Sequence, residues 1–223
     1  MLPLRDINKP VKSPIITRML VIVNIVIFIA TYFRPRRQFE SIIWLFGVKP
    51  AYILRGKELY TLLTSMFLHG DLHHIIGNMI YLWIFGDNVE DRMGHLKFLI
   101  FYLSSGIIGS IVQSIFMPNS TMPMIGASGA ISGVLGAYFI LFPWARILTL
   151  VLGFFIWLIE IPAYYYLGFW FLLQLLYGTI SLGGYIGPVA YWAHIGGFIF
   201  GLLITFIFKD KLERIEEYYV MWI

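Results

Sequence analysis

The chain has 223 residues, of which 59% are hydrophobic, 18% are aromatic and 13% are charged. Soluble domains average roughly 45–50% apolar and about 25% charged residues, so this composition excludes an ordinary soluble domain and predicts an integral membrane protein. The net charge of +4 lies mainly on loops and flanks, where it bears on orientation and on anionic headgroups and indicates no nucleic-acid partner. The absence of cysteine excludes disulfides, iron–sulfur clusters and thiol catalysis.

Six apolar runs, in chain order, predict helices that cross a hydrocarbon core ~30 Å thick, and none alternates as a barrel strand does. They are Ile15–Phe33, Leu72–Gly86, His95–Phe116, Ile125–Phe142, Ile161–Gly178 and Val189–Phe208. We therefore predict an all-α polytopic membrane protein, a six-transmembrane-helix bundle over residues 15–208. Residues 1–14 form an N-terminal segment and residues 209–223 a C-terminal tail, both expected in the cytoplasm.

Two stretches between these runs have a different character. The long connection Arg34–Asp71, between the first and second spans, mixes aromatic and charged side chains as an element in the membrane interface does. The apolar stretch Arg146–Leu158 is short for a crossing helix, so we favour a re-entrant or interfacial segment, with a seventh span as the alternative.

The orientation follows from the lysines and arginines, which are in excess in cytoplasmic loops. With a cytoplasmic N-terminus, ten lie inside: Arg5, Lys9, Lys12, Arg18, Arg92, Lys97, Arg146, Lys209, Lys211 and Arg214. Six lie outside, all in the first connection: Arg34, Arg36, Arg37, Lys49, Arg55 and Lys57. The expected location is the plasma membrane of a prokaryotic cell.

Polar side chains inside lipid are costly and indicate function by default. The inventory is short: His69, His73, His74, Asn78, Ser128, Ser132 and His194. The second, fourth and sixth spans run inward in this topology. At about 1.5 Å per residue, His74, Ser128 and His194 therefore all lie within the outermost ~10 Å. His74 and Asn78 are four residues apart and project together.

Glycine stripes on two of these spans allow the helix backbones to approach closely. One stripe begins next to Ser128 and consists of Gly129, Gly133 and Gly136. The other shares a face with His194 and consists of Gly197 and Gly201. Docking one stripe against the other would bring Ser128 near His194.

Each polar residue alone has a structural interpretation: Ser128 as a packing residue, His194 as a buried core histidine, and His74 with Asn78 as a link between helices. Together, Ser128 and His194 supply a nucleophile and its general base, and His74 with Asn78 offers donors to a developing oxyanion. No Asp or Glu lies in the outer half of these three spans, so the prediction is a dyad rather than a triad.

A metal site is the competing interpretation of "HGDLHH", because His69 and His73 are spaced four apart as in a histidine box. A di-metal membrane oxygenase needs several such boxes, and the remaining His95 and His194 lie on opposite sides of the predicted bundle. We expect no metal and no cofactor.

Four motifs resemble the rhomboid family of intramembrane serine proteases. They are "HIIGN" (His74–Asn78), "GASG" (Gly126–Gly129), "AHIGGFIFG" around His194, and "FGDNVEDRMG" (Phe85–Gly94) after the second span. The resemblance implies a six-helix core with a water-filled cavity opening to the outer side, and transmembrane segments of other proteins as substrates within the lipid bilayer.

The resemblance also implies roles for single residues. Ser128 is the nucleophile and His194 the base, while the Ser128 backbone N–H and the side chains of His74 and Asn78 form the oxyanion hole. Gly126 allows close backbone approach, and span five with the loop before His194 forms a lateral gate. The alternatives are a catalytically silent rhomboid-like protein that binds transmembrane helices, and a polytopic transporter or channel.

Two positions depart from the family pattern. Ser132 stands where some members have a tyrosine that stacks on the catalytic histidine, so the support of His194 is open. Tyr60 and Thr61 stand where the outer connection of the family often has a Trp-Arg pair.

Overall fold

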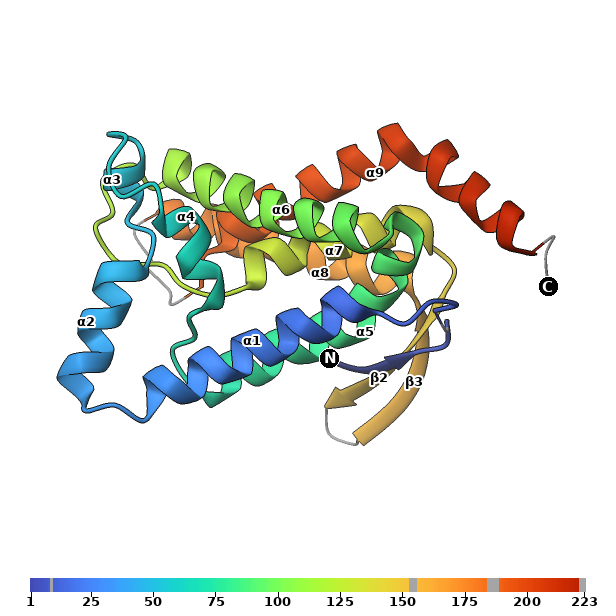
Figure 1. Ribbon diagram of the computed structural model, residues 1–223, viewed down its shortest axis with the longest axis horizontal. Coiled ribbons are helices and arrows are strands. Elements are labelled where there is room, and N and C mark those ends of the chain that lie inside the picture. The colour runs from blue at the N-terminus through green and yellow to red at the C-terminus, as the bar shows by residue number, and fades with distance from the viewer. Residues whose placement is uncertain (9, 153–155, 184–188, 221–223) are drawn as a thin grey trace.

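The computed structural model describes residues 1–8, 10–152, 156–183 and 189–220. Within these residues the protein is predominantly helical, as predicted (Figure 1). In this described part of the chain, four helices are long and apolar enough to cross a membrane: Ile15–Tyr32, His95–Phe116, Ala163–Leu182 and Tyr191–Asp210. The protein is therefore an integral, multi-pass membrane protein.

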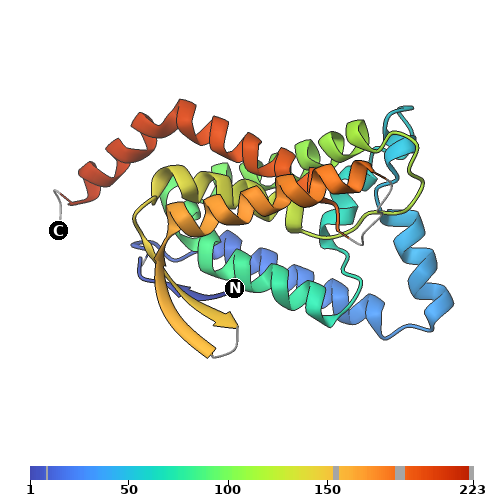
Figure 2. The same cartoon turned by 180° about the vertical axis from the view of Figure 1, so that it is seen from behind.

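The predicted spans correspond to long helices that run side by side (Figures 1 and 2). They are α1 (Ile15–Tyr32), α5 (Leu72–Met93), α6 (His95–Phe116), α7 (Ser128–Leu141), α8 (Ala163–Leu182) and α9 (Tyr191–Val220). α9 continues through most of the predicted tail, whose residues 221–223 lie outside the described residues, as does part of the loop before α9.

α5 and α7 do not reach the length and hydropathy of the other four helices, so the count of six spans remains a prediction. α7 has only 14 residues, and most of them are buried. A helix enclosed by other helices has little contact with lipid, and the thickness of the bilayer does not set its length.

α5 carries charged residues near its end, where Glu90 is buried and accepts hydrogen bonds from the backbone N–H groups of Ile16 at 2.8 Å and Thr17 at 2.7 Å. Glu90 therefore caps the start of α1.

The long connection after α1 contains short helices: α2 (Arg36–Phe46), α3 (Pro50–Ile53), α4 (Thr61–Thr64) and the 3₁₀ turn η1 (Ser65–Phe67). Lys49 is fully buried within it and pairs with Glu58 at 2.6 Å. Val48 exchanges two backbone hydrogen bonds with Met124, and the N–H of Gly126 donates to the carbonyl of Ser65 at 2.9 Å. Backbone hydrogen bonds from the long connection after α1 therefore fix the position of the segment that leads into α7.

Residues 146–152 and 156–158 of the Arg146–Leu158 stretch form strands, which argues against the alternative of a seventh helical span. The described residues belong to an antiparallel hairpin of β2 (Arg146–Leu152) and β3 (Ile156–Pro162), and β1 (Leu2–Asp6) pairs with β2 in a three-stranded sheet. The hairpin residues are rich in β-branched and aromatic types, which favour strands. The sheet is an addition to the predicted all-helical bundle, and α8 starts at Ala163 because β3 includes Ile161.

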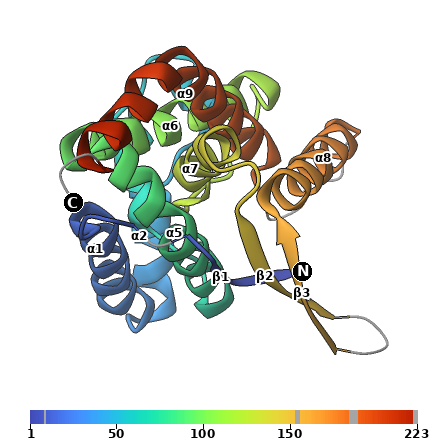
Figure 3. The same ribbon diagram turned by 90° about the vertical axis from the view of Figure 1, so that its right-hand side faces the viewer.

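Figure 3 shows where this sheet lies. It is at the end of the bundle where α5 and α7 finish, and its strands extend past α5 and α8. We call this the sheet end, and the end where α5, α7 and α9 begin the site end.

Candidate functional site

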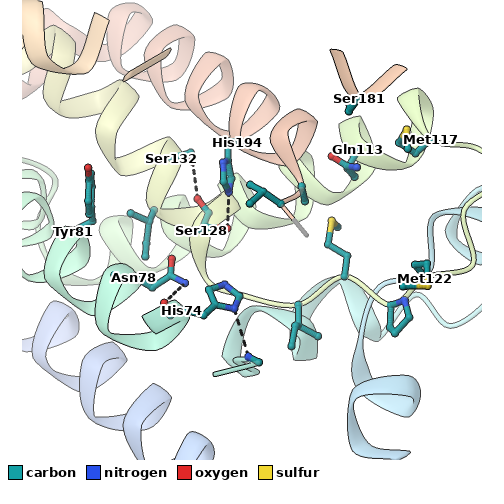
Figure 4. Close-up of a pocket in the computed structure, with 18 of the residues that line it drawn as sticks. His74, Asn78, Tyr81, Gln113, Met117, Met122, Ser128, Ser132, Ser181 and His194 are labelled. Carbon is teal, nitrogen blue, oxygen red and sulfur yellow. Dashed lines mark hydrogen bonds between the residues drawn. The ribbon is translucent and has the colours of Figure 1, made fainter. Parts of the chain in front are cut away.

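A cavity of about 680 Å³ lies at the site end of the bundle. Its lining includes polar side chains from the starts of α5, α7 and α9 (Figure 4). The residues that bear on chemistry are His74, Asn78, Ser128, Ser132, Trp170 and His194. The predicted polar residues of the three spans therefore face one cavity.

Ser128 and His194 are joined by a hydrogen bond. Ser128 is the first residue of α7, and its Oγ lies 2.8 Å from Nε2 of His194 near the start of α9. At this distance the serine proton can pass to the imidazole.

The glycine stripes of α7 and α9 pack against each other and set this distance. A Cβ added at Gly201 would lie 2.7 Å from both Cα and C of Gly133. A Cβ added at Gly136 would lie 2.8 Å from the backbone nitrogen of Leu202. Backbone atoms cannot move aside as a flexible side chain can, so only glycine allows α7 and α9 to approach this closely. Gly129 and Gly197 belong to the same seam.

His74 lies on the other side of Ser128, with its ring against Gly126. Asp71 accepts from the backbone N–H of His74 at 2.9 Å and caps the start of α5. The N–H of Gly70 donates to Nδ1 of His74 at 3.4 Å. Because neutral histidine has one donor and one acceptor nitrogen, Nε2 then carries the proton, and it is Nε2 that faces Gly126: a Cβ there would lie 2.6 Å away.

Two further groups complete the donors around Ser128. The side-chain amide of Asn78 donates to the carbonyl of His74 at 3.1 Å and lines the cavity. The backbone N–H groups at the start of α7 have no intrahelical acceptor and carry the positive end of the helix dipole. Gly126 has φ +123°, a conformation that glycine adopts without strain.

The hydrogen bond of Ser132 stays within its own helix. Its hydroxyl donates to the carbonyl of Ser128, four residues earlier, at 2.6 Å. Two aromatic rings neighbour His194: Trp170 on α8, with ring centroids 6.0 Å apart and planes tilted by 30°, and Tyr191 on α9, edge-on with centroids 6.5 Å apart. The residue that stands at the place of the family's tyrosine therefore satisfies its hydroxyl within the first turn of α7.

Sequence reasoning missed Gln174, whose Oε1 lies 2.9 Å from Nδ1 of His194. The residue differs from the triad pattern in two ways, because it is an amide rather than a carboxylate and it lies on α8 rather than on α5, α7 or α9. A signal was present, because Gln174 is an isolated polar residue inside the apolar stretch "FWFLLQLLYG".

The two remaining histidines of "HGDLHH" stand apart from the dyad. The His73 side chain is fully exposed, whereas His69 is buried with its ring edge-on to His74, centroids 5.0 Å apart. Burial lowers the pKa of His69 to about 3, so its ring is neutral at physiological pH. In the described ranges no cluster of three metal-ligating side chains occurs.

This arrangement defines a class: a polytopic helical membrane protein in which a serine at a helix start is hydrogen-bonded to a histidine inside a cavity. A family model described as the Rhomboid domain matches residues 56–211, which is more than half of the chain. The chain belongs to the rhomboid family.

Several curated proteins are similar to it. Rhomboid protein 1, mitochondrial, from Saccharomyces cerevisiae is 31% identical over 174 residues, which are 73% of this chain and 47% of that protein. RHOMBOID-like protein 6, mitochondrial, from Arabidopsis thaliana is 32% identical over 156 residues, 70% of this chain and 45% of that protein. Rhomboid protease GluP from Bacillus subtilis is 42% identical over 92 residues, 41% of this chain and 18% of that protein.

The chain thus spans less than half the length of each of these three relatives. Two of the three carry mitochondrial in their names, so the relatives give no support to the expected location in a prokaryotic plasma membrane.

Proposed function

We propose that this protein is an intramembrane serine endopeptidase that cleaves transmembrane segments of other membrane proteins, with Ser128 as nucleophile and His194 as general base. The observation that carries the proposal is the 2.8 Å hydrogen bond between Ser128 Oγ and His194 Nε2. Family membership supports it, and GluP, one relative, is named a protease.

In the proposed reaction, His194 Nε2 takes the proton of Ser128 as Oγ attacks the scissile carbonyl carbon. The peptide nitrogen leaves with the proton that His194 returns, which forms an ester between the substrate acyl group and Oγ. Water, deprotonated by His194, attacks this ester and releases the acid and the free serine.

The oxyanion of each tetrahedral intermediate would receive hydrogen bonds from the Ser128 backbone N–H, from His74 Nε2–H and from the Asn78 amide. Asn78 now donates to the carbonyl of His74, so its amide would turn toward the substrate. Donors aimed at developing charge in a site of low dielectric contribute about 10²–10³-fold each to the rate.

A substrate carbonyl within a helix is already hydrogen-bonded, so the substrate must unwind locally before Ser128 reaches it. We therefore expect preferred substrates to have small residues at the cut and helix-breaking residues nearby. Entry beside α8 would follow the lateral gate that the family resemblance implies, formed by span five and the loop before His194.

The test is cleavage of a panel of single-span substrates by purified protein in liposomes, beside Ser128→Ala and His194→Ala. Ser104→Ala, on α6 outside the cavity lining, is the matched control. We expect cleavage by wild type and the control alone, and labelling of Ser128 by a fluorophosphonate. Equal cleavage by wild type and Ser128→Ala would overturn the assigned nucleophile, and no cleavage or labelling by any form would favour a silent rhomboid-like protein.

A further inference from the structure

His194 uses both ring nitrogens in hydrogen bonds, and the second bond comes from a helix that carries none of the predicted site residues. Nε2 faces Ser128 Oγ, and Nδ1 lies 2.9 Å from Oε1 of Gln174 on α8. Gln174 is 8% exposed, so few waters compete for this contact.

The orientation of the Gln174 amide is determined by its other end. Its Nε2 donates to the carbonyl of Trp170, one turn earlier, at 3.3 Å. A flipped amide would set its oxygen against that carbonyl oxygen, so Oε1 is the atom that faces His194. An oxygen there accepts, and the proton of neutral His194 must lie on Nδ1. The lone pair of Nε2 is then directed at Ser128, as the base requires.

We propose that Gln174 is the positioning residue of His194, which makes the site a Ser–His–Gln triad; the proposal rests on the proposed function. Gln174 holds the imidazole in the tautomer and rotation that a carboxylate imposes in soluble serine proteases. A neutral amide does this without a buried charge, which is costly at this depth. It stabilises the imidazolium less than a carboxylate would.

The placement of Gln174 on α8 has a mechanical consequence. Only 22% of the α8 span is buried, against 50% for α6 and 44% for α9, and Figure 3 shows α8 on the outside of the bundle. Displacement of α8 from α9 would separate Gln174 from His194 and break their hydrogen bond, so the imidazole ring would no longer be held in one orientation. The orientation of the histidine therefore depends on α8 being docked.

The kinetic test compares Gln174→Leu, which removes the acceptor at similar volume, with Gln174→Glu, which keeps an acceptor oxygen. We expect Gln174→Leu to lower kcat about 10–100-fold, by analogy with the loss of partners that orient metal-ligating histidines, with KM changed by less than about twofold. Gln174→Glu restores most of kcat and shifts the acidic limb of the kcat/KM profile to higher pH, because a carboxylate favours protonated His194.

A purely structural role predicts the opposite order, since burying a charge would make Gln174→Glu at least as damaging as Gln174→Leu. Thr179→Val, an exposed change on the same helix whose hydroxyl bonds only within α8, is the control. If the Gln174→Leu variant had the same kcat and the same pH profile as the wild type, the proposal would be overturned.

A second readout needs no substrate, so failure of the proposed function remains distinguishable. The ¹⁵N spectrum of histidine-labelled protein, assigned with His194→Ala, reports which ring nitrogen is protonated. We expect a protonated Nδ1 on His194 in the wild type and its loss in Gln174→Leu. A proton on Nε2 in the wild type would overturn the assignment whatever the activity.

An independent observation concerns β3, which exposes four consecutive apolar side chains. Their exposed fractions are 73% for Ile156, 58% for Trp157, 60% for Leu158 and 40% for Ile159. Consecutive strand residues point to opposite sides, so both faces of β3 carry apolar side chains with large exposed fractions.

The surroundings of β3 identify what covers it. β3 runs directly into α8, whose exposed surface faces lipid, and exposed aromatic rings cluster at the same level of the sheet end. They are Trp144, Tyr164 and Tyr165. The rings of Trp144 and Tyr164 are stacked, with their centroids 6.1 Å apart. Such rings concentrate at the boundary between hydrocarbon and water. The strands run across the helix axes and extend beyond the bundle (Figures 1 and 3).

We infer that β3 lies in the headgroup region of the bilayer at the sheet end, with its apolar side chains inserted toward the acyl chains. β3 is an edge strand, and its unpaired backbone groups can bond water and headgroups there, whereas hydrocarbon offers them no partner. The interface, rather than the hydrocarbon core or free water, suits both the side chains and the backbone.

The absence of cysteine allows a single-label test in liposomes of purified protein. An environment-sensitive fluorophore would be attached at Leu158→Cys and, as control, at Asn119→Cys in an exposed turn. We expect the label at position 158 to be quenched by lipids with a nitroxide near the headgroup and shielded from iodide, and the control label to show the reverse. Equal iodide quenching at both positions, without nitroxide quenching at 158, would overturn the inference.

Discussion

Gly126 stands two residues before the proposed nucleophile, where the backbone has φ +123° and the ring of His74 lies against it. A side chain here meets two costs: about 1–3 kcal/mol for an unfavourable backbone conformation, and a clash between its Cβ and His74 Nε2, which would be 2.6 Å apart. Both effects act on the proposed oxyanion hole.

We therefore expect Gly126→Ala to lower the cleavage rate by about 10²-fold or more, the effect of losing one oxyanion donor, and to lower thermal stability in detergent. Cleavage of a model substrate and the unfolding midpoint measure the two effects. A rate within a few-fold of wild type would show that His74 does not act at this position.

At the sheet end, Asp6 of β1 accepts hydrogen bonds from the Tyr138 hydroxyl at 2.6 Å and from the Asn88 amide at 2.8 Å. These bonds join β1 to α7 and α5. Burial raises the pKa of Asp6 to about 6, and the hydrogen bond from Tyr138 acts in the opposite direction.

Because this folded-state pKa is above that of a free aspartate, the folded protein takes up a proton that the unfolded chain does not hold between about pH 4 and 6. The stability from this group is present at low pH and lost as pH rises through about 6. We expect the unfolding midpoint of wild type to fall by a few degrees between pH 5 and 7 relative to Asp6→Asn. Parallel profiles for the two proteins would contradict this.

At the scale of elements, the packing of α7 against α9 is the contact least tolerant of substitution. The two backbones are so close that the contacting positions have room only for glycine. Gly201→Ala places a Cβ 2.7 Å from the backbone of Gly133, and α9 must move away from α7. His194 lies seven residues earlier on the same face, so it moves away from Ser128 as well.

We expect Gly201→Ala to lower the unfolding midpoint and to lower the cleavage rate at least ~10-fold. This loss is expected although alanine favours a helix over glycine by about 1 kcal/mol. Gly168→Ala is the matched control on α8, since its Cβ would meet only Phe139 at an ordinary 3.8 Å. It should leave activity unchanged and raise stability slightly. Similar results for the two variants would show that the seam tolerates side chains.

For the whole molecule, the charge distribution predicts which side of the membrane each end faces. Arg37 on α2 lies at the site end and Lys97 on α6 at the sheet end, and both side chains are exposed. With a cytoplasmic N-terminus, the site end faces outward.

Single cysteines at these two positions test this in intact cells, because the chain has none of its own. An impermeant maleimide should label Arg37→Cys at once and Lys97→Cys only after the membrane is permeabilised. The reverse pattern would invert the proposed topology and place the cavity on the cytoplasmic side.

The sequence by itself determined the helical membrane class and the placement of His74, Ser128 and His194 near the starts of three helices that meet at one cavity. Hydropathy, helical rise and spacing are local properties that can be read along the chain, and they place a polar residue relative to the start of its own helix. Glycine spacing likewise identified the faces of α7 and α9 that approach, because close backbone contact admits no other residue.

Only the tertiary structure decided which side chains meet across elements. Gln174 reaches His194 because of the rotation and height of α8 against α9, and hydropathy does not report either of these. The strand formed by Arg146–Leu152 depends on pairing with β3 and with β1, where Leu2 lies opposite Leu150. Strand pairing rests on distant partners, so an apolar stretch of this length is ambiguous until they are known.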